Sequence, residues 1–192
     1  MTERIKEAAL YEDLAGVPDD KIAEIIEGDL YVSPRPAPRH ANATSTLGAD
    51  LHDAFQRGRR GPGGWWILDE PELHLGADVL VPDIGGWRHE RMPELPELPW
   101  FEIPPDWLCE VISPSSERID RQAKLPIYAR AAIQFLWIVD PSLRTLEVLA
   151  RKDGGWRLVS AHSGDTVICE PPFEAVSIEL APLWSRARPA SA

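Results

Sequence analysis

The sequence predicts an α+β (α/β) protein in which a central mixed sheet is flanked by helices and followed by extra C-terminal β-hairpins. Much of the chain consists of short apolar or β-branched runs bounded by Gly, Pro and Asp, a pattern typical of strands. Two stretches show helical spacing instead, one before and one after the middle of the chain. With 192 residues, 44% of them hydrophobic, the chain is long enough for one domain with a sizeable core.

The first third of the chain predicts a short helix, a hairpin and a long helix. The short helix is expected around residues 10–14, before Gly16 and Pro18. Residues 21–26 and 30–33 form the predicted hairpin, because a Gly-containing turn separates them. A Pro-rich connector then leads to His40, and helical spacing follows until Gly58 through Thr44, Leu47, Leu51 and Phe55.

Three strands are predicted next, at residues 65–68, 72–75 and 79–84. Their connections are short, which favours antiparallel pairing. Asp83 would then stand near the end of a central strand. Glu72 and His74 share one face of the preceding strand and offer either extra ligands or, more simply, a solvent-facing pair.

Residues 88–105 are too rich in proline for a helix interior or a central strand. We expect an ordered arm whose Trp100 and Phe101 pack on the body or on a second subunit. A homodimer is therefore a reasonable expectation.

Residues 107–112 alternate as a strand with two faces, and this strand carries an inward-facing acid. Glu110 and Ile112 share one face, whereas Trp107, Cys109 and Val111 share the other. A buried carboxylate is costly unless something pairs with it. Either a divalent cation shared with Asp83 or the ammonium of Lys124 would meet that need.

The helix after Glu110 is expected to start around residues 120–123, which places Pro126 in its first turn. Lys124 and Tyr128 are four residues apart and should point inward together. A buried strand at 135–139, a hairpin of 143–150 with 156–161, and short strands at 166–168 and 176–178 follow. We expect a single domain over residues 1–184, with a core of about 22–150, a β-rich extension at 151–184 and a frayed tail at 185–192.

Three motifs in order carry a resemblance: Pro82-Asp83, Glu110-Val111-Ile112 and the Lys124-x-x-x-Tyr128 pair. Together they resemble the PD-(D/E)XK nuclease superfamily, and residues 104–141 are similar to the Uma-two family of endonucleases. AEIIEGDLYVSPRP with the following His40 resembles that family's first strands and helix, so the resemblance covers roughly 24–147.

The resemblance implies a restriction-endonuclease-like core that hydrolyses phosphodiester bonds of DNA with Mg²⁺ or Mn²⁺. In that case Asp83 and Glu110 are the metal ligands and Lys124 is the catalytic lysine. Glu24, His40 and Tyr128 would contact these residues and help to orient them. For Glu24, an acid on the surface of its strand is the simpler interpretation.

Two positions depart from the family pattern. The superfamily's lysine usually lies two residues after the glutamate, where this chain has Ile112, so Lys124 would have to reach the site from the helix. The family commonly has Gly near the end of that helix, where Ala132 would be less comfortable in a left-handed cap.

The net charge of −11 argues against a protein that grips phosphate backbones over a wide surface. What matters is the local field, and the basic residues gather in clusters: Arg35 and Arg39; Arg57, Arg59 and Arg60; Arg88 and Arg91; and Arg118, Arg121 and Lys124.

Cysteine and histidine spacing excludes the common alternative sites. Cys109 and Cys169 lack CxxC spacing and are expected to be reduced core residues, and the histidines show neither H-x-H nor HExxH spacing. The charged N-terminal residues have no apolar signal core and no later run is long enough to span a membrane, so we expect a cytoplasmic protein.

Two other interpretations stay open. In the first, the fold is a non-catalytic module for nucleic-acid or protein binding, and Asp83, Glu110 and Lys124 form a structural ion network. In the second, the C-terminal third belongs to a β-rich small-molecule or metal enzyme. The second would need a ligand cluster there, and the sequence offers only His162 and Asp165.

Overall fold

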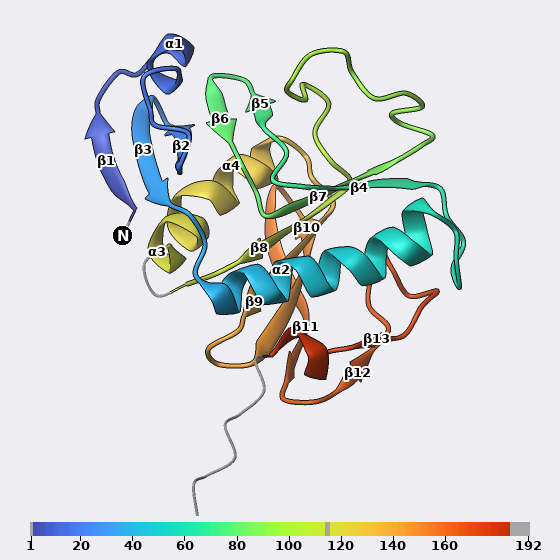
Figure 1. Cartoon of the computed structure of the whole chain (residues 1–192). Coiled ribbons are helices and arrows are strands. Elements are labelled where there is room, and N and C mark those ends of the chain that lie inside the picture. Colours follow the sequence, from blue (N-terminus) through green and yellow to red (C-terminus); the bar gives the residue numbers. More distant parts are fainter. Residues whose placement is uncertain (1, 114–115, 185–192) are drawn as a thin grey trace, which may run out of the picture.

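The computed structural model describes residues 2–113 and 116–184, which build two large sheets and one two-stranded sheet, with helices packed between and around the large ones (Figure 1). The larger sheet has six strands, in the order β11 (Gly155–Ser163), β10 (Thr145–Lys152), β9 (Phe135–Asp140), β8 (Trp107–Val111), β7 (Ile84–Arg88) and β4 (Trp65–Asp69). The β8–β9 pair is parallel and the other neighbours are antiparallel. The expected α+β fold with a central mixed sheet is therefore confirmed.

The second sheet is antiparallel throughout and contains the predicted hairpin. Its strands, in spatial order, are β1 (Glu3–Lys6), β3 (Asp29–Pro34), β2 (Lys21–Ile26), β6 (Asp78–Leu80) and β5 (Leu73–Leu75). Strand β1 was not predicted, because its residues are exposed and alternate in no recognisable way. A small pair of β12 (Val167–Ile168) and β13 (Ile178–Glu179) lies near the C-terminal end.

Helices cover both faces of the six-stranded sheet. The long helix α2 (Pro38–Leu51), extended by the π-helical segment η1 (His52–Gln56), packs on the face of Trp107, Cys109 and Val111. The opposite face is covered by the continuous run of α3 (Glu117–Ile119), η2 (Asp120–Lys124) and α4 (Leu125–Arg130). The remaining helices are short: α1 (Tyr11–Leu14) and η3 (Ala181–Leu183).

The C-terminal residues belong to the same core as helix α2. Phe173 is fully buried, and its ring contacts Phe55, Trp65, Trp107 and Trp137 at centroid distances of 4.6–5.6 Å. Rings at these distances add packing energy beyond simple area burial. The segment after β11 thus closes the α2 side of the core. The predicted tail at 185–192 lies outside the described residues.

The prediction of one strand at residues 79–84 is wrong. Strand β6 ends at Leu80 and pairs in the second sheet, whereas β7 begins at Ile84 and pairs in the six-stranded sheet. Pro82 lies in the link and cannot donate to a strand ladder, which is why the run breaks there. Asp83 therefore stands in the crossover between two sheets.

The expected helix start at 120–123 is also wrong. The helix begins at Glu117 and runs through Pro126 to Arg130. A π-helical hydrogen bond, from the amide of Leu125 to the carbonyl of Asp120, precedes the proline. Pro126 has no N–H and so cannot donate the regular helical hydrogen bond to the carbonyl four residues before it. The wider π-helical turn accommodates the proline at this point. At the other end, Ala132 has a φ of 62° and so takes the left-handed cap position.

The proline-rich arm packs on its own body. The Trp100 ring stacks on His74 at 4.8 Å, and the Phe101 ring stacks on Trp87 at 4.6 Å. Phe101 also exchanges backbone hydrogen bonds with Glu72 and His74 at the edge of β5. Both aromatic rings therefore have partners within the chain and do not require a second subunit. The homodimer stays a prediction.

Two smaller expectations can be checked directly. Cys109 is buried as predicted, but Cys169 is exposed, so the prediction of two core cysteines is wrong for the second. Within the described ranges, no helix has both the length and the apolar character needed to cross a membrane.

Candidate active site

Asp83 and His40 form one side of the site. The Asp83 carboxylate accepts a hydrogen bond from the amide of Val111 at 2.7 Å, and its other oxygen lies 3.2 Å from His40 Nε2. His40 stands in the first turn of α2, where its Nδ1 is 3.4 Å from the hydroxyl of Thr44. Burial alone would lower the pKa of His40, but the hydrogen bond and charge of Asp83 outweigh it and raise the pKa.

Glu110 lies in the centre of the site on strand β8. Its side chain faces α4, and it is 2% exposed. The hydroxyl of Tyr128 donates to Glu110 Oε1 at 2.6 Å, and the same oxygen lies 3.5 Å from Lys124 Nζ. Burial raises the pKa of Glu110 well above its usual value, although Lys124 opposes this shift.

Lys124 lies on the far side of Glu110 and contacts three acids. Its Nζ is 2.8 Å from Glu24, 3.2 Å from Asp120 and 3.5 Å from Glu110, and the residue is 5% exposed. Burial alone would lower the pKa of Lys124, but the three carboxylates together raise it well above its usual value. The ammonium is therefore held in its charged form.

Glu24 is a buried member of the site, so its interpretation as a surface acid is wrong. It is 4% exposed, and its Oε1 accepts a hydrogen bond from the amide of Val81 at 2.9 Å. Burial raises the pKa of Glu24, while Lys124 opposes the shift. Strand β2 pairs with β6 on one side, and Glu24 links this sheet to η2 through its contact with Lys124.

Asp120 is the site residue that the sequence analysis missed. It is 4% exposed and pairs with Lys124 one turn later. The signal was available, because an acid four residues before a lysine shares its helical face. The shared face was overlooked because the helix was expected to begin around Asp120, whereas it begins at Glu117.

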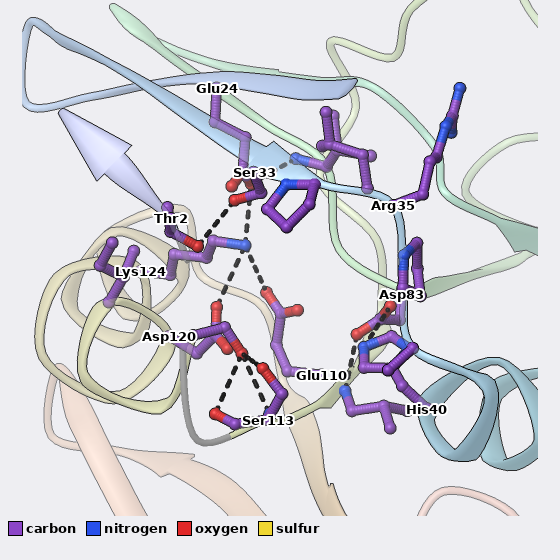
Figure 2. A pocket seen from close by; sticks show the side chains of 18 residues that line it. Thr2, Glu24, Ser33, Arg35, His40, Asp83, Glu110, Ser113, Asp120 and Lys124 are labelled. Atoms are coloured by element: carbon purple, nitrogen blue, oxygen red, sulfur yellow. Dashed lines mark hydrogen bonds and ion pairs between the residues drawn. The ribbon is translucent and has the colours of Figure 1, made fainter. Parts of the chain in front are cut away.

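These residues enclose one pocket of about 340 Å³ (Figure 2). The Glu110 carboxylate lies between Lys124 on one side and Asp83 with His40 on the other, and Arg35 stands at the rim. The pocket therefore gathers the predicted catalytic residues, with Tyr128 directly behind Glu110. Four acids line it against a single lysine: Glu24, Asp83, Glu110 and Asp120.

The other candidate ligands lie elsewhere. His74 pairs with Glu72 at 2.8 Å beneath the proline-rich arm. His162 pairs with Glu170 at 2.7 Å, and Asp165 pairs with Arg144 near the C-terminal strands. In the parts of the chain that the structure describes, no three His, Cys, Asp or Glu side chains converge in metal-binding geometry. Magnesium sites commonly use only one or two carboxylates and fill the remaining positions with water and substrate oxygens.

Comparisons with known proteins match the chain to one protein family and to a solved structure. The model of the Uma2 family, described as "Putative restriction endonuclease", matches residues 8–181. Among solved structures, the chain is similar to "a putative nuclease belonging to DUF820" from Anabaena variabilis ATCC 29413. The two are 20% identical with a TM-score of 0.72, over 90% of this chain and 96% of that one. This likeness confirms the restriction-endonuclease-like fold. No curated protein matches the chain.

Proposed function

This chain belongs to the Uma2 family, whose model matches residues 8–181, and on that premise we propose that it is a metal-dependent endonuclease acting on DNA. In this proposal Asp83 and Glu110 hold Mg²⁺ or Mn²⁺, together with a main-chain carbonyl near Val111. Lys124 is the catalytic lysine, supplied by the helix instead of the strand.

The observation that carries the proposal is the convergence of Asp83 and Glu110 on one pocket beside a buried lysine. Asp83 lies in the link just before β7, and the antiparallel pairing of Ile84 with Cys109 brings it beside Glu110 on β8. The pocket also fits a divalent cation chemically, because its four carboxylates outnumber its two basic side chains, Lys124 and Arg35. Hard oxygen donors of this kind are those that Mg²⁺ prefers.

Each residue of the site has a separate role in the proposed reaction. His40 and the amide of Val111 orient Asp83, and Tyr128 orients Glu110. Lys124, which its neighbours keep charged, would orient the attacking water or offset negative charge on the phosphate. Glu24 and Asp120 hold the ammonium in the pocket. A bound Mg²⁺ would lower the pKa of its water and offset charge on the phosphate oxygens.

A second candidate function is a non-catalytic module of the same fold. The observation that favours it is the closed arrangement of Lys124, whose ammonium contacts three acids within 3.5 Å. Such a network could serve the fold alone. The module would bind nucleic acid or protein without cutting it.

Cleavage assays on matched variants distinguish the two candidates. We expect wild type to nick plasmid DNA or cut single-stranded DNA with Mg²⁺ or Mn²⁺ and to stop in EDTA. The near-isosteric variants Asp83→Asn and Glu110→Gln should lose at least about a hundredfold in rate, as should Lys124→Ala. Asp50→Asn, which changes an exposed acid further along α2, should cut like wild type.

Folding and metal binding must be measured on the same proteins. Circular dichroism checks that each variant is folded, and calorimetric titration with Mn²⁺ checks whether Asp83→Asn and Glu110→Gln bind the ion more weakly. Wild type that neither cuts DNA nor binds Mn²⁺ would overturn the endonuclease proposal. Retained DNA binding in that protein would favour the non-catalytic module.

A further inference from the structure

A second pocket of about 410 Å³ lies directly beside the proposed catalytic pocket. The two share three lining residues, Ala37, His40 and Ser113. Ile112 and Ser113 follow strand β8, while Pro141 and Ser142 follow strand β9, which runs parallel to it. The second pocket, called the adjacent pocket below, is therefore at the carboxyl ends of the two parallel strands, where ligands of α/β sheets commonly bind.

His40 lines both pockets, and its ring is held in place by two neighbours. Its ring is held by Asp83 on one nitrogen at 3.2 Å and by the Thr44 hydroxyl near the other at 3.4 Å. The side chain is 13% exposed and lines both pockets. A polymer bound at Asp83 would enter the adjacent pocket by crossing this side chain.

The adjacent pocket differs chemically from its neighbour. None of its described lining residues is acidic, whereas four acids line the catalytic pocket. Pro38, Ile112 and Pro141 line it; Pro38 is exposed, whereas Ile112 and Pro141 are buried. The exposed ring of Pro38 offers an apolar surface to the face of a nucleobase, and the volume lies within the range of roughly 300–1,000 Å³ typical of ligand pockets.

One cation stands at the edge of the adjacent pocket. Arg39 is exposed, and among the described residues it has no ion-pair partner. Arg35 differs, because its guanidinium donates to the carbonyl of Asp19 at 2.7 Å and lies 3.5 Å from Glu70. In a chain with a net charge of −11, a cation without an acid beside it is available to an anionic ligand.

We propose that the adjacent pocket binds the DNA nucleotide next to the scissile phosphate, with its phosphate on Arg39 and its base against Pro38. This inference rests on the proposed function. A base held on this side chain cannot remain stacked in a duplex, and unstacking costs least where the base is unpaired. The preferred substrate is therefore single-stranded DNA, or duplex DNA with an unpaired base beside the cut.

Cleavage and binding of a short single-stranded DNA oligonucleotide test this inference. Binding is followed by fluorescence anisotropy with Ca²⁺ in place of Mg²⁺, and cleavage is followed with Mg²⁺. We expect Arg39→Ala to weaken both by about tenfold and Arg39→Lys to recover part of the loss. The control is Arg157→Ala, because this exposed arginine pairs opposite Ala150, at the other end of the β9–β11 strands from Pro141.

Two further comparisons separate a bound nucleotide from a general charge effect. Ser142 is an exposed lining residue, so Ser142→Glu should weaken binding while Ser142→Gln, of equal size and no charge, should not. An oligonucleotide with one abasic site, moved stepwise along the strand, should lose binding at one position beside the cut. Paired duplex should be cut about tenfold more slowly than the same strand alone.

The outcomes are distinguishable from a failure of the proposed function. If wild type cuts DNA but Arg39→Ala and Ser142→Glu behave as wild type, the adjacent pocket does not bind substrate and the endonuclease proposal stands. Equal cutting of paired and single-stranded DNA, with no abasic effect, would also overturn the inference. If wild type neither cuts nor binds the oligonucleotide, both proposals fall.

Discussion

Replacement of Lys124 with Met should destabilise the protein strongly in the absence of metal. Met keeps the length and apolar stem of the side chain but removes an ammonium that lies within 3.5 Å of three carboxylates. Removing one partner from a buried ion pair costs about 3–5 kcal/mol, because the remaining charge is left unpaired. For a chain of this size, 1 kcal/mol shifts Tm by roughly 2–4 °C, so we expect a loss of about 6–20 °C.

The loss should depend on pH in a defined direction. Burial already raises the pKa of Glu24 and Glu110 above the usual value of 4.5, and replacing Lys124 removes the main charge that opposes that shift. The native variant then holds protons at a pH where the unfolded chain has released them. The unfolded state binds fewer protons, so the free energy of unfolding falls as pH rises above about 4.5. The deficit of Lys124→Met should be largest near pH 8 and smaller near pH 5.

Urea unfolding in EDTA at both pH values measures this effect. Lys152→Met is the matched control, because Lys152 is exposed at the end of β10 and the same change there should alter stability by less than about 0.5 kcal/mol. A Lys124→Met protein as stable as wild type at pH 8 would refute the reasoning. A deficit of equal size at both pH values would show that the cost comes from packing and not from unpaired carboxylates.

Three further predictions concern the backbone and the cysteines. Ala132 has a φ of 62°, so Ala132→Gly should raise the free energy of unfolding by about 1 kcal/mol, and a loss of stability in thermal melts would contradict the left-handed cap. Burial raises the pKa of Cys109 well above 9.0, so a thiol reagent at pH 8 should modify only Cys169 in the native protein and both cysteines in denaturant. Pro126→Ala should change stability by less than about 1 kcal/mol instead of the gain of about 3 expected at a regular helix interior, because Pro126 directly follows the π-helical segment.

Local patterns predicted the elements well, but not the sheet to which each strand belongs. The alternation at 107–111 places Cys109 and Glu110 on opposite faces, as the structure has them. The apolar run at 79–84 also looked continuous, yet it divides between two sheets at Pro82. Pro82 marks the break, but the sheet that each half joins is set by long-range pairing of β6 with β2 and of β7 with β4, which the run itself does not show.

The identity of most site residues could be predicted from the sequence, but their burial and charge pairing could not. The resemblance named residues on strand β2, helix α2, the β6–β7 link, strand β8 and the helical run of η2 and α4, and the structure brings them into one cluster. Burial of Glu24 could not be predicted, because a single acid in a strand looks the same whether it faces water or a lysine from a distant helix. Asp120 was missed for a different reason, since the helix was expected to begin around it and the shared face of Asp120 and Lys124 was not considered.

The lysine beside Glu110, Lys124, is the last residue of the π-helical segment and not a residue of strand β8. Ile112 is on the Glu110 side of the strand, but it is 2% exposed and packs in an apolar cluster with Leu108 and Ile127, where an ammonium would lack partners. Lys124 enters from the helix instead, where Glu24 and Asp120 are within reach. The charge that faces Glu110 is therefore attached to the helix and not to the strand. Its position depends on how α4 packs on the sheet, so the core beneath the helix also sets the geometry of the site.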